Sequence, residues 1–83
     1  MTATATVGQS AEDIIRRIIA DITLKPTTSF GLDDDLPRLL SLDSLSLLRI
    51  VADIEATFNV RVDDARFHEL RTLRAMLGEV NRR

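Results

Sequence analysis

Residues 44–58 form an unbroken stretch in which apolar side chains recur at helical spacing, so the chain must fold around a helix of this length. Asp43 or Ser44 before the stretch and Asn59 after it suit the two ends of such a helix. At about 100° per residue, one arc carries the side chains expected to face a core, namely Leu47, Ile50, Val51, Ile54 and Phe58. A neighbouring arc, on the same side as Ser44, is expected to be at least partly exposed and carries Leu45, Leu48, Ala52 and Ala56.

Three further segments show helical signatures. Ser10 is suited to cap a helix over 11–24, which carries isoleucines at spacings of one, three and four and ends before Pro26. A short helix is expected over about 63–68, and Thr72 is suited to cap a last one. The expected fold class is therefore all-α, a small four-helix bundle of three longer helices and one short helix.

A long connection, residues 25–43, separates the first two helices of this bundle. A loop of this length in a small domain is often functional. We expect a turn of helix around 36–40, and we expect the apolar residues of the connection to pin it to the core: Phe30, Leu32, Leu36, Leu39 and Leu40. The run Asp33-Asp34-Asp35 lacks the spaced ligands and the glycine of a calcium loop, which favours a solvated acidic loop.

Composition removes several classes of function. The 83 residues include no cysteine and only one histidine, His68, so neither a disulfide nor a metal centre is expected. No basic run is interleaved with aromatics, and no apolar run has membrane-spanning length, so neither nucleic acid nor a membrane is the expected partner. Residues 1–9 lack the layout of a signal peptide and are expected to be a disordered lead-in to a domain over 10–83. We expect a cytoplasmic monomer.

Charge is distributed unevenly along the chain, although the formal net charge is only −2. Residues 31–43 carry four aspartates and one arginine, whereas residues 61–83 carry six arginines and four acidic residues. The domain is therefore expected to have an acidic middle and a mildly basic end.

Asp43-Ser44-Leu45, at the start of the second helix, is the focal point for chemistry. A serine in the first turn of a helix has an exposed hydroxyl, and the helix N-terminus favours an incoming phosphate. Asp43 is placed to help position a divalent cation during phosphoryl transfer. By itself, Asp-Ser at a helix start is usually no more than a cap.

The stretch from Leu42 to Val60 resembles the acyl carrier protein family, whose second helix opens on Leu-Asp-Ser-Leu and whose glutamate-rich end closes in phenylalanine. The resemblance covers nearly the whole chain after residue 9. It implies that Ser44, with Asp43 beside it, is esterified by 4′-phosphopantetheine, which a phosphopantetheinyl transferase donates from coenzyme A. The thiol of this arm would hold an acyl or aminoacyl group as a thioester. The chain itself would catalyse nothing and would serve a loading enzyme for acyl or aminoacyl groups and downstream condensing or tailoring enzymes.

Two positions depart from the pattern of this family. The family commonly has glycine where this chain has Ser41, and fatty-acid carriers usually have an acidic residue at the position of Arg49. Together with Leu45, Leu48 and Ala52, Arg49 forms the expected partner-binding face. Its charge favours a specialised polyketide or hybrid peptide pathway over fatty-acid synthesis. The alternatives are a free-standing peptidyl or aminoacyl carrier and an unmodified helical protein-interaction domain.

Overall fold

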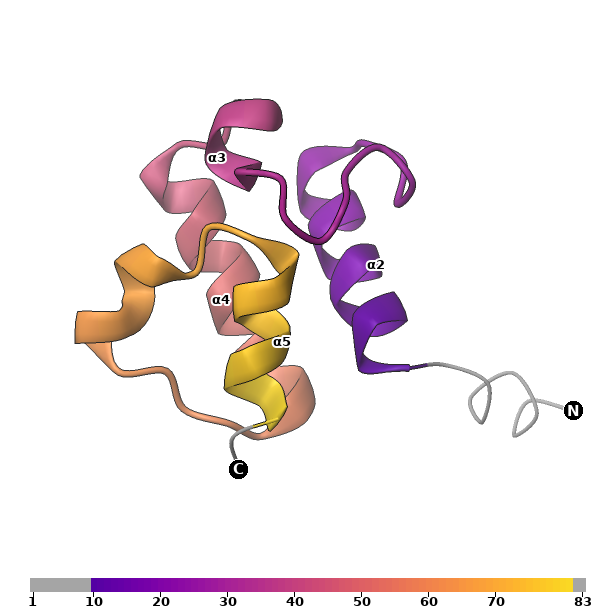
Figure 1. Cartoon of the computed structure of the whole chain (residues 1–83). Helices are drawn as coiled ribbons and strands as arrows, with labels where there is room; N and C mark the ends of the chain where they lie inside the picture. Colours follow the sequence, from indigo (N-terminus) through magenta and orange to yellow (C-terminus); the bar gives the residue numbers. More distant parts are fainter. Residues whose placement is uncertain (1–9, 82–83) are drawn as a thin grey trace, which may run out of the picture.

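The computed structural model describes residues 10–81, which form a small bundle of helices with no strand in that range, as the all-α prediction requires (Figure 1). The expected lead-in over 1–9 lies outside the described residues. The elements in chain order are α2 (Ala11–Thr23), α3 (Leu36–Leu39), α4 (Ser44–Phe58), the 3₁₀ helix η1 (Asp64–Glu69) and α5 (Leu73–Asn81). None of the helices in residues 10–81 has the length and apolar character needed to span a bilayer.

The first described helix, α2, begins and ends through local hydrogen bonds. Asp13 donates its backbone N–H to the Ser10 hydroxyl oxygen at 3.2 Å, which confirms Ser10 as the cap. The helix ends when Leu24 turns into the left-handed region (φ 61°) and donates its N–H to the carbonyl of Ala20 at 2.7 Å. The turn therefore comes two residues before Pro26.

The core lies where α2 packs against both α4 and α5. In Figure 1, α2 runs up the view while α4 and α5 run down it, so α2 is antiparallel to both. Eight of the described apolar side chains have at most 2% of their surface exposed. Six of them come from these three helices, namely Ile15 and Ile19 from α2, Ile50 and Ile54 from α4, and Leu73 and Met76 from α5, and the other two are Leu36 and Leu70. Burial of a large aliphatic side chain typically contributes about 1.5–3 kcal/mol, so these contacts hold the bundle together.

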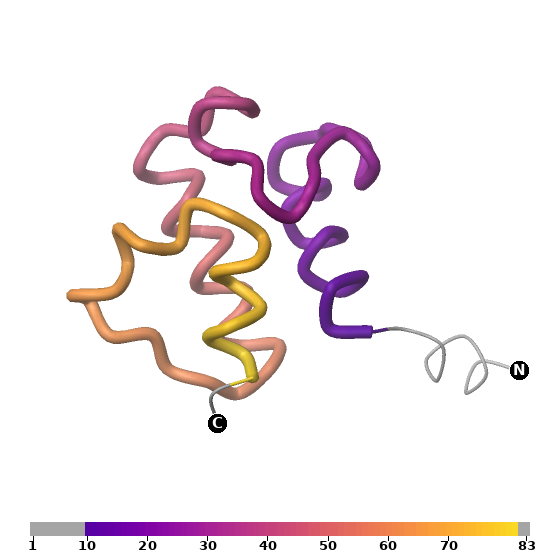
Figure 2. Tube along the Cα trace, in the orientation of Figure 1, coloured from indigo at the N-terminus to yellow at the C-terminus, as the bar shows by residue number. Residues whose placement is uncertain are grey.

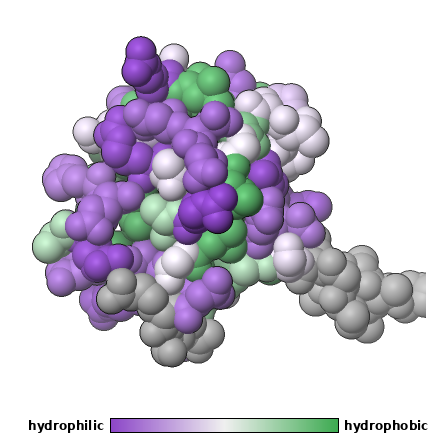
Figure 3. Space-filling model, viewed as in Figure 1, coloured by the Kyte–Doolittle hydropathy of each residue, from purple (hydrophilic) through white to green (hydrophobic). Residues whose placement is uncertain are grey.

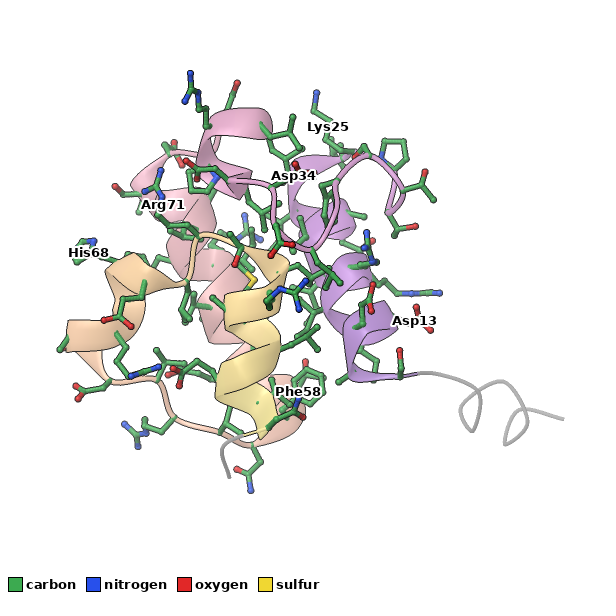
Figure 4. The ribbon with its side chains drawn as sticks, in the orientation of Figure 1. Asp13, Lys25, Asp34, Phe58, His68 and Arg71 are labelled. Atoms are coloured by element: carbon green, nitrogen blue, oxygen red, sulfur yellow. The ribbon has the colours of Figure 1, made fainter. Side chains whose placement is uncertain are left out.

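The two arcs predicted for α4 are confirmed. Leu47, Ile50, Val51 and Ile54 are buried, and Phe58 packs against the core from the far end of the helix while remaining partly exposed. Figure 4 shows Phe58 at the opposite end of the bundle from Lys25 and Asp34. Asn59 ends α4 in the left-handed region (φ 55°), which asparagine tolerates better than most residues.

The connection between α2 and α4 is anchored at its first half by Arg16 of α2. Its Nη1 donates to the carbonyl oxygens of Thr27 at 2.8 Å and Phe30 at 2.6 Å, and its guanidinium lies over the Phe30 ring, 5.2 Å from the centroid. In this connection Phe30, Leu36 and Leu40 are buried as predicted, and Leu32 packs against the core. The expectation for Leu39 was wrong. It is 49% exposed, because the single turn of α3 presents Leu36 and Leu40 to the core instead.

The second half of the connection is tied to the start of α5. The N–H of Leu36 donates to the carbonyl of Arg71 at 2.8 Å, and the N–H of Arg74 donates to the carbonyl of Leu32 at 3.0 Å. Figure 2 shows these two segments running side by side.

Two ion pairs reinforce this contact. Arg74 donates two hydrogen bonds to the Asp33 carboxylate, at 2.7 and 3.1 Å. Arg71 Nη2 donates to Asp35 Oδ2 at 3.0 Å. The bond from Arg74 lowers the pKa of Asp33. Asp34 accepts the N–H of Gly31 at 2.6 Å. Asp33 and Asp34 are exposed, as a solvated loop requires, whereas Asp35 is partly buried. Each of the three is also held by a group of the chain itself, which sequence analysis did not anticipate.

Candidate functional site

Ser44 is the first residue of α4 and is exposed to solvent. Among residues 10–81, neither its hydroxyl nor its backbone N–H makes a hydrogen bond, and the N–H of Leu45 is also free. The N–H groups of a helix's first turn carry partial positive charge and favour a phosphate. The serine therefore combines an accessible hydroxyl with free donors that suit a phosphate ester.

Asp43 caps α4 and fixes its start. Its Oδ1 accepts the N–H of Ser46 at 2.8 Å, and its carbonyl accepts the N–H of Leu47 at 3.1 Å. The backbone N–H and, to a smaller extent, the hydroxyl of Ser46 lower the pKa of the Asp43 carboxyl. The structure thus places an ionised, exposed carboxylate directly before Ser44.

Replacement of Asp43 by asparagine is expected to make the domain less sensitive to acid. Because the pKa of Asp43 is lowered in the folded state, the ionised cap contributes its full stabilisation above pH 3.8, the ordinary pKa of this carboxyl. This contribution is lost as the pH falls through the lower pKa that Asp43 has in the folded protein. Asparagine caps equally well but does not titrate. Urea unfolding at neutral pH should therefore give similar midpoints for wild type and Asp43→Asn. Below pH 3.8 the wild type should lose more stability than the variant. An equal loss in both proteins would contradict this account of the cap.

The turn that enters α4 is built around Ser41. The N–H of Leu42 donates to the carbonyl of Pro37 at 2.9 Å, and Ser41 between them has φ 55°, in the left-handed region that favours glycine. Serine therefore adopts, at a conformational cost, the backbone that glycine would adopt freely.

Replacement of Ser41 by glycine is expected to stabilise the domain. A left-handed non-glycine residue costs about 1–2 kcal/mol, and the greater freedom of glycine in the unfolded chain offsets about 0.4–1 kcal/mol of this. The net gain in the free energy of unfolding is about 0.5–1 kcal/mol, measured by urea titration. Ser41→Val is the opposing variant and should lower stability, since a β-branched side chain fits this region worst. A glycine variant less stable than wild type would argue against the left-handed turn.

The second arc of α4 presents a largely apolar surface beside the serine. Leu45 is 70% and Leu48 is 52% exposed, and Arg49 and Ala52 are also exposed. We call these four residues the α4 face. Across the described residues, no hydrogen bond or ion pair involves the Arg49 side chain, although Asp53 follows one turn later.

The other candidate side chains lack the setting of Ser44. Ser46 is half-buried and its backbone N–H is bonded to Asp43, and Ser41 lies in the turn rather than in the helix. His68 is exposed on η1, points away from the bundle in Figure 4 and makes an edge contact with the ring of Phe67, with centroids 5.5 Å apart. In the part of the chain that the structure describes, no hydrogen bond joins His68 to Ser44.

Sequence analysis missed the arginines that fold onto the acidic loop, although the unequal charge distribution contained a signal for them. The acidic run 33–35 and the basic residues Arg71 and Arg74 have opposite signs, and Figure 4 shows Arg71 extending from the segment before α5.

The fold and the site define a class of protein: a small helical domain that presents an exposed serine at a helix N-terminus, beside an ionised carboxylate. Comparison with known families matches residues 13–80 to the family described as "Phosphopantetheine attachment site". Because this match covers most of the chain, the protein belongs to that family, whose cofactor is covalently bound 4′-phosphopantetheine. Carrier domains of this kind interact with phosphopantetheinyl transferases and with acyl-handling enzymes. No curated protein matches the sequence significantly.

The residues at the start of α4 fit this cofactor. A phosphodiester on the Ser44 hydroxyl would lie beside the free N–H groups of Ser44 and Leu45, and the exposed side chain leaves room for the arm to extend into solvent. The arm would supply the thiol that the sequence lacks, since the chain has no cysteine.

Proposed function

We propose that this chain is a carrier protein that bears 4′-phosphopantetheine on Ser44 and holds acyl or aminoacyl intermediates as thioesters on the thiol of that arm. The observation that carries the proposal is the exposed hydroxyl of Ser44, free of hydrogen bonds within residues 10–81, at the N-terminus of α4. Membership of the phosphopantetheine attachment family supports it.

The attachment step is a phosphoryl transfer on a partner enzyme. Ser44 Oγ attacks the phosphorus that bears pantetheine in coenzyme A. A new P–O bond forms to the serine while the pyrophosphate P–O bond breaks. Adenosine 3′,5′-bisphosphate leaves, and the hydroxyl proton passes to a base of the transferase. Asp43, which is ionised and adjacent, is placed to help hold the divalent cation that offsets the charge of the pyrophosphate.

In this proposal the chain moves intermediates and its partner enzymes perform the chemistry. A covalent tether makes each later step an encounter at high effective concentration. Enzymes that attach or transform the cargo would recognise the α4 face, because it adjoins the serine and exposes two leucines. Because coenzyme A and its transferases act inside cells, we place the carrier in the cytoplasm.

We also propose that the pathway is a specialised one, such as polyketide or hybrid peptide synthesis. Support comes from Arg49, which occupies a position where fatty-acid carriers resembling this chain usually have an acidic residue. Its side chain is exposed, so partner enzymes would meet a positive charge there.

The proposal is tested by intact mass spectrometry of the purified chain after incubation with coenzyme A, Mg²⁺ and a broad-specificity phosphopantetheinyl transferase. We expect the mass to rise by one phosphopantetheine unit, and peptide mapping should place the group on Ser44. Modification at Ser41 or Ser46 would overturn the site assignment. An unmodified chain after exhaustive incubation would instead favour the helical interaction domain.

A further inference from the structure

Three of the four exposed large apolar side chains among the described residues lie close together in the sequence. The four are Leu24 (86% exposed), Leu39 (49%), Leu45 (70%) and Leu48 (52%). Three of them lie in α3 and in the first two turns of α4, on either side of Ser44 along the chain. Figure 3 shows apolar residues at the upper end of the view, where α3 lies, and also at its centre, within a largely hydrophilic surface. Exposed apolar groups that gather in this way are typical of a protein-binding surface.

The charges near this surface differ from what composition predicts. The three aspartates of the run 33–35 are held by Arg74, the Gly31 N–H and Arg71, and Asp43 is bonded to Ser46. Arg38 and Arg49, in contrast, are exposed, and their side chains make no hydrogen bond or ion pair to any residue in the range 10–81. Two of the three aspartates in the run 33–35 are therefore ion-paired with arginines of the chain itself, whereas Arg38 and Arg49 keep positive charges that no described residue pairs. A partner at this surface meets those two arginines together with the exposed carboxylates of Asp43 and Asp53.

One partner must contact this surface more closely than any other. The enzyme that attaches the cofactor has to bring a phosphorus atom within bonding distance of Ser44 Oγ, whereas later enzymes can act on the far end of the arm. Arg49 lies five residues further along α4, about 7.5 Å along the helix axis, and one turn beyond Leu45. A transferase that covers the start of α4 therefore comes close to Arg49.

We infer that the phosphopantetheinyl transferase of this chain docks on the α4 face through an apolar surface bordered by carboxylates, one of which pairs with Arg49. This inference rests on the proposed attachment at Ser44. An arginine covered by a neutral or basic enzyme surface would lose water without gaining a partner, which is costly. A carboxylate on the transferase offsets that cost and speeds the encounter at low salt.

The test uses the phosphopantetheinyl transferases of the source organism, each purified, with coenzyme A and Mg²⁺. Modification rates are measured for wild type, Arg49→Glu, Arg49→Lys and the control Arg61→Glu. Arg61 is also exposed and free of ion pairs among the described residues, but it lies beyond the far end of α4. With the transferase most active on wild type, we expect Arg49→Glu to lower kcat/KM about tenfold at low salt, mainly through KM, and Arg49→Lys to retain most of it. At about 1 M salt, where the screening length is about 3 Å, the difference should shrink to about twofold or less. Arg61→Glu should match wild type throughout.

Each other result has a defined meaning. Equal or faster modification of Arg49→Glu at low salt overturns the inference while leaving the attachment at Ser44 intact. A loss that persists unchanged at high salt also overturns it, because it would reflect shape rather than charge. If no transferase modifies wild type, the proposed function itself fails, and the unmodified mass shows this directly. Circular dichroism of all four proteins confirms that each variant is folded.

Discussion

Replacement of Ser44 by alanine is expected to abolish attachment of phosphopantetheine while leaving the fold unchanged. The hydroxyl oxygen is the atom that forms the phosphodiester, so its removal leaves no nucleophile at the site. The cap of α4 should survive, because it runs from Asp43 to the N–H of Ser46 and does not use the Ser44 side chain. Alanine is also a good helix former. Intact mass after incubation with transferase and coenzyme A should show complete modification of wild type and none of the variant.

The neighbouring serines provide matched controls. Ser41→Ala and Ser46→Ala each remove a hydroxyl within three residues of Ser44, and both variants should still accept one phosphopantetheine. Ser46→Ala retains the backbone N–H that bonds Asp43, so its helix start is preserved. Modification of Ser44→Ala, or its loss only in one of the control variants, would move the attachment site. Matching far-ultraviolet circular dichroism would show that a negative result reflects chemistry and not unfolding.

The start and end of α4 could be predicted because the signals that fix them are local. An aspartate immediately before the helix and an asparagine immediately after it act within one turn, and both act as predicted. The buried and exposed arcs followed from helical periodicity alone. The exposure of Ser44 and its free N–H donors follow from its first-turn position, but it was the resemblance of the stretch from Leu42 to Val60 to a known family that singled it out as the attachment residue.

The features that sequence analysis missed depend on contacts between distant segments. Arg74 meets Asp33 across 41 positions of sequence and Arg71 meets Asp35 across 36, and no local pattern specifies either pairing. The exposure of Leu39 was missed because a four-residue helix is too short for periodicity to show which side packs inward. The consequence for the site is electrostatic. Composition indicated an acidic connection before α4, whereas the folded chain pairs Asp33 and Asp35 with arginines and leaves Arg49 without an ion pair among the described residues.

Replacement of Ile54 by alanine is expected to lower the free energy of unfolding by about 2–5 kcal/mol, the range for loss of a large buried aliphatic side chain. Ile54 is 2% exposed and lies in the core where α2, α4 and α5 meet. A domain of this size has a total stability of about 5–10 kcal/mol, so the variant should be close to partial unfolding at physiological temperature. Urea titration followed by circular dichroism measures the change directly.

Leu48→Ala is the matched control for this core substitution. It also shortens a large aliphatic side chain in α4, but Leu48 is 52% exposed, so much less apolar surface returns to water on unfolding. Leu48→Ala should lower the free energy of unfolding by less than about 1 kcal/mol. Under conditions where both variants are folded, it should slow modification by the transferase more than Ile54→Ala does. The two variants thus separate the arc of α4 that holds the bundle together from the arc that we propose meets partner enzymes. Equal destabilisation by both would mean that α4 is rotated about its axis relative to the arrangement described.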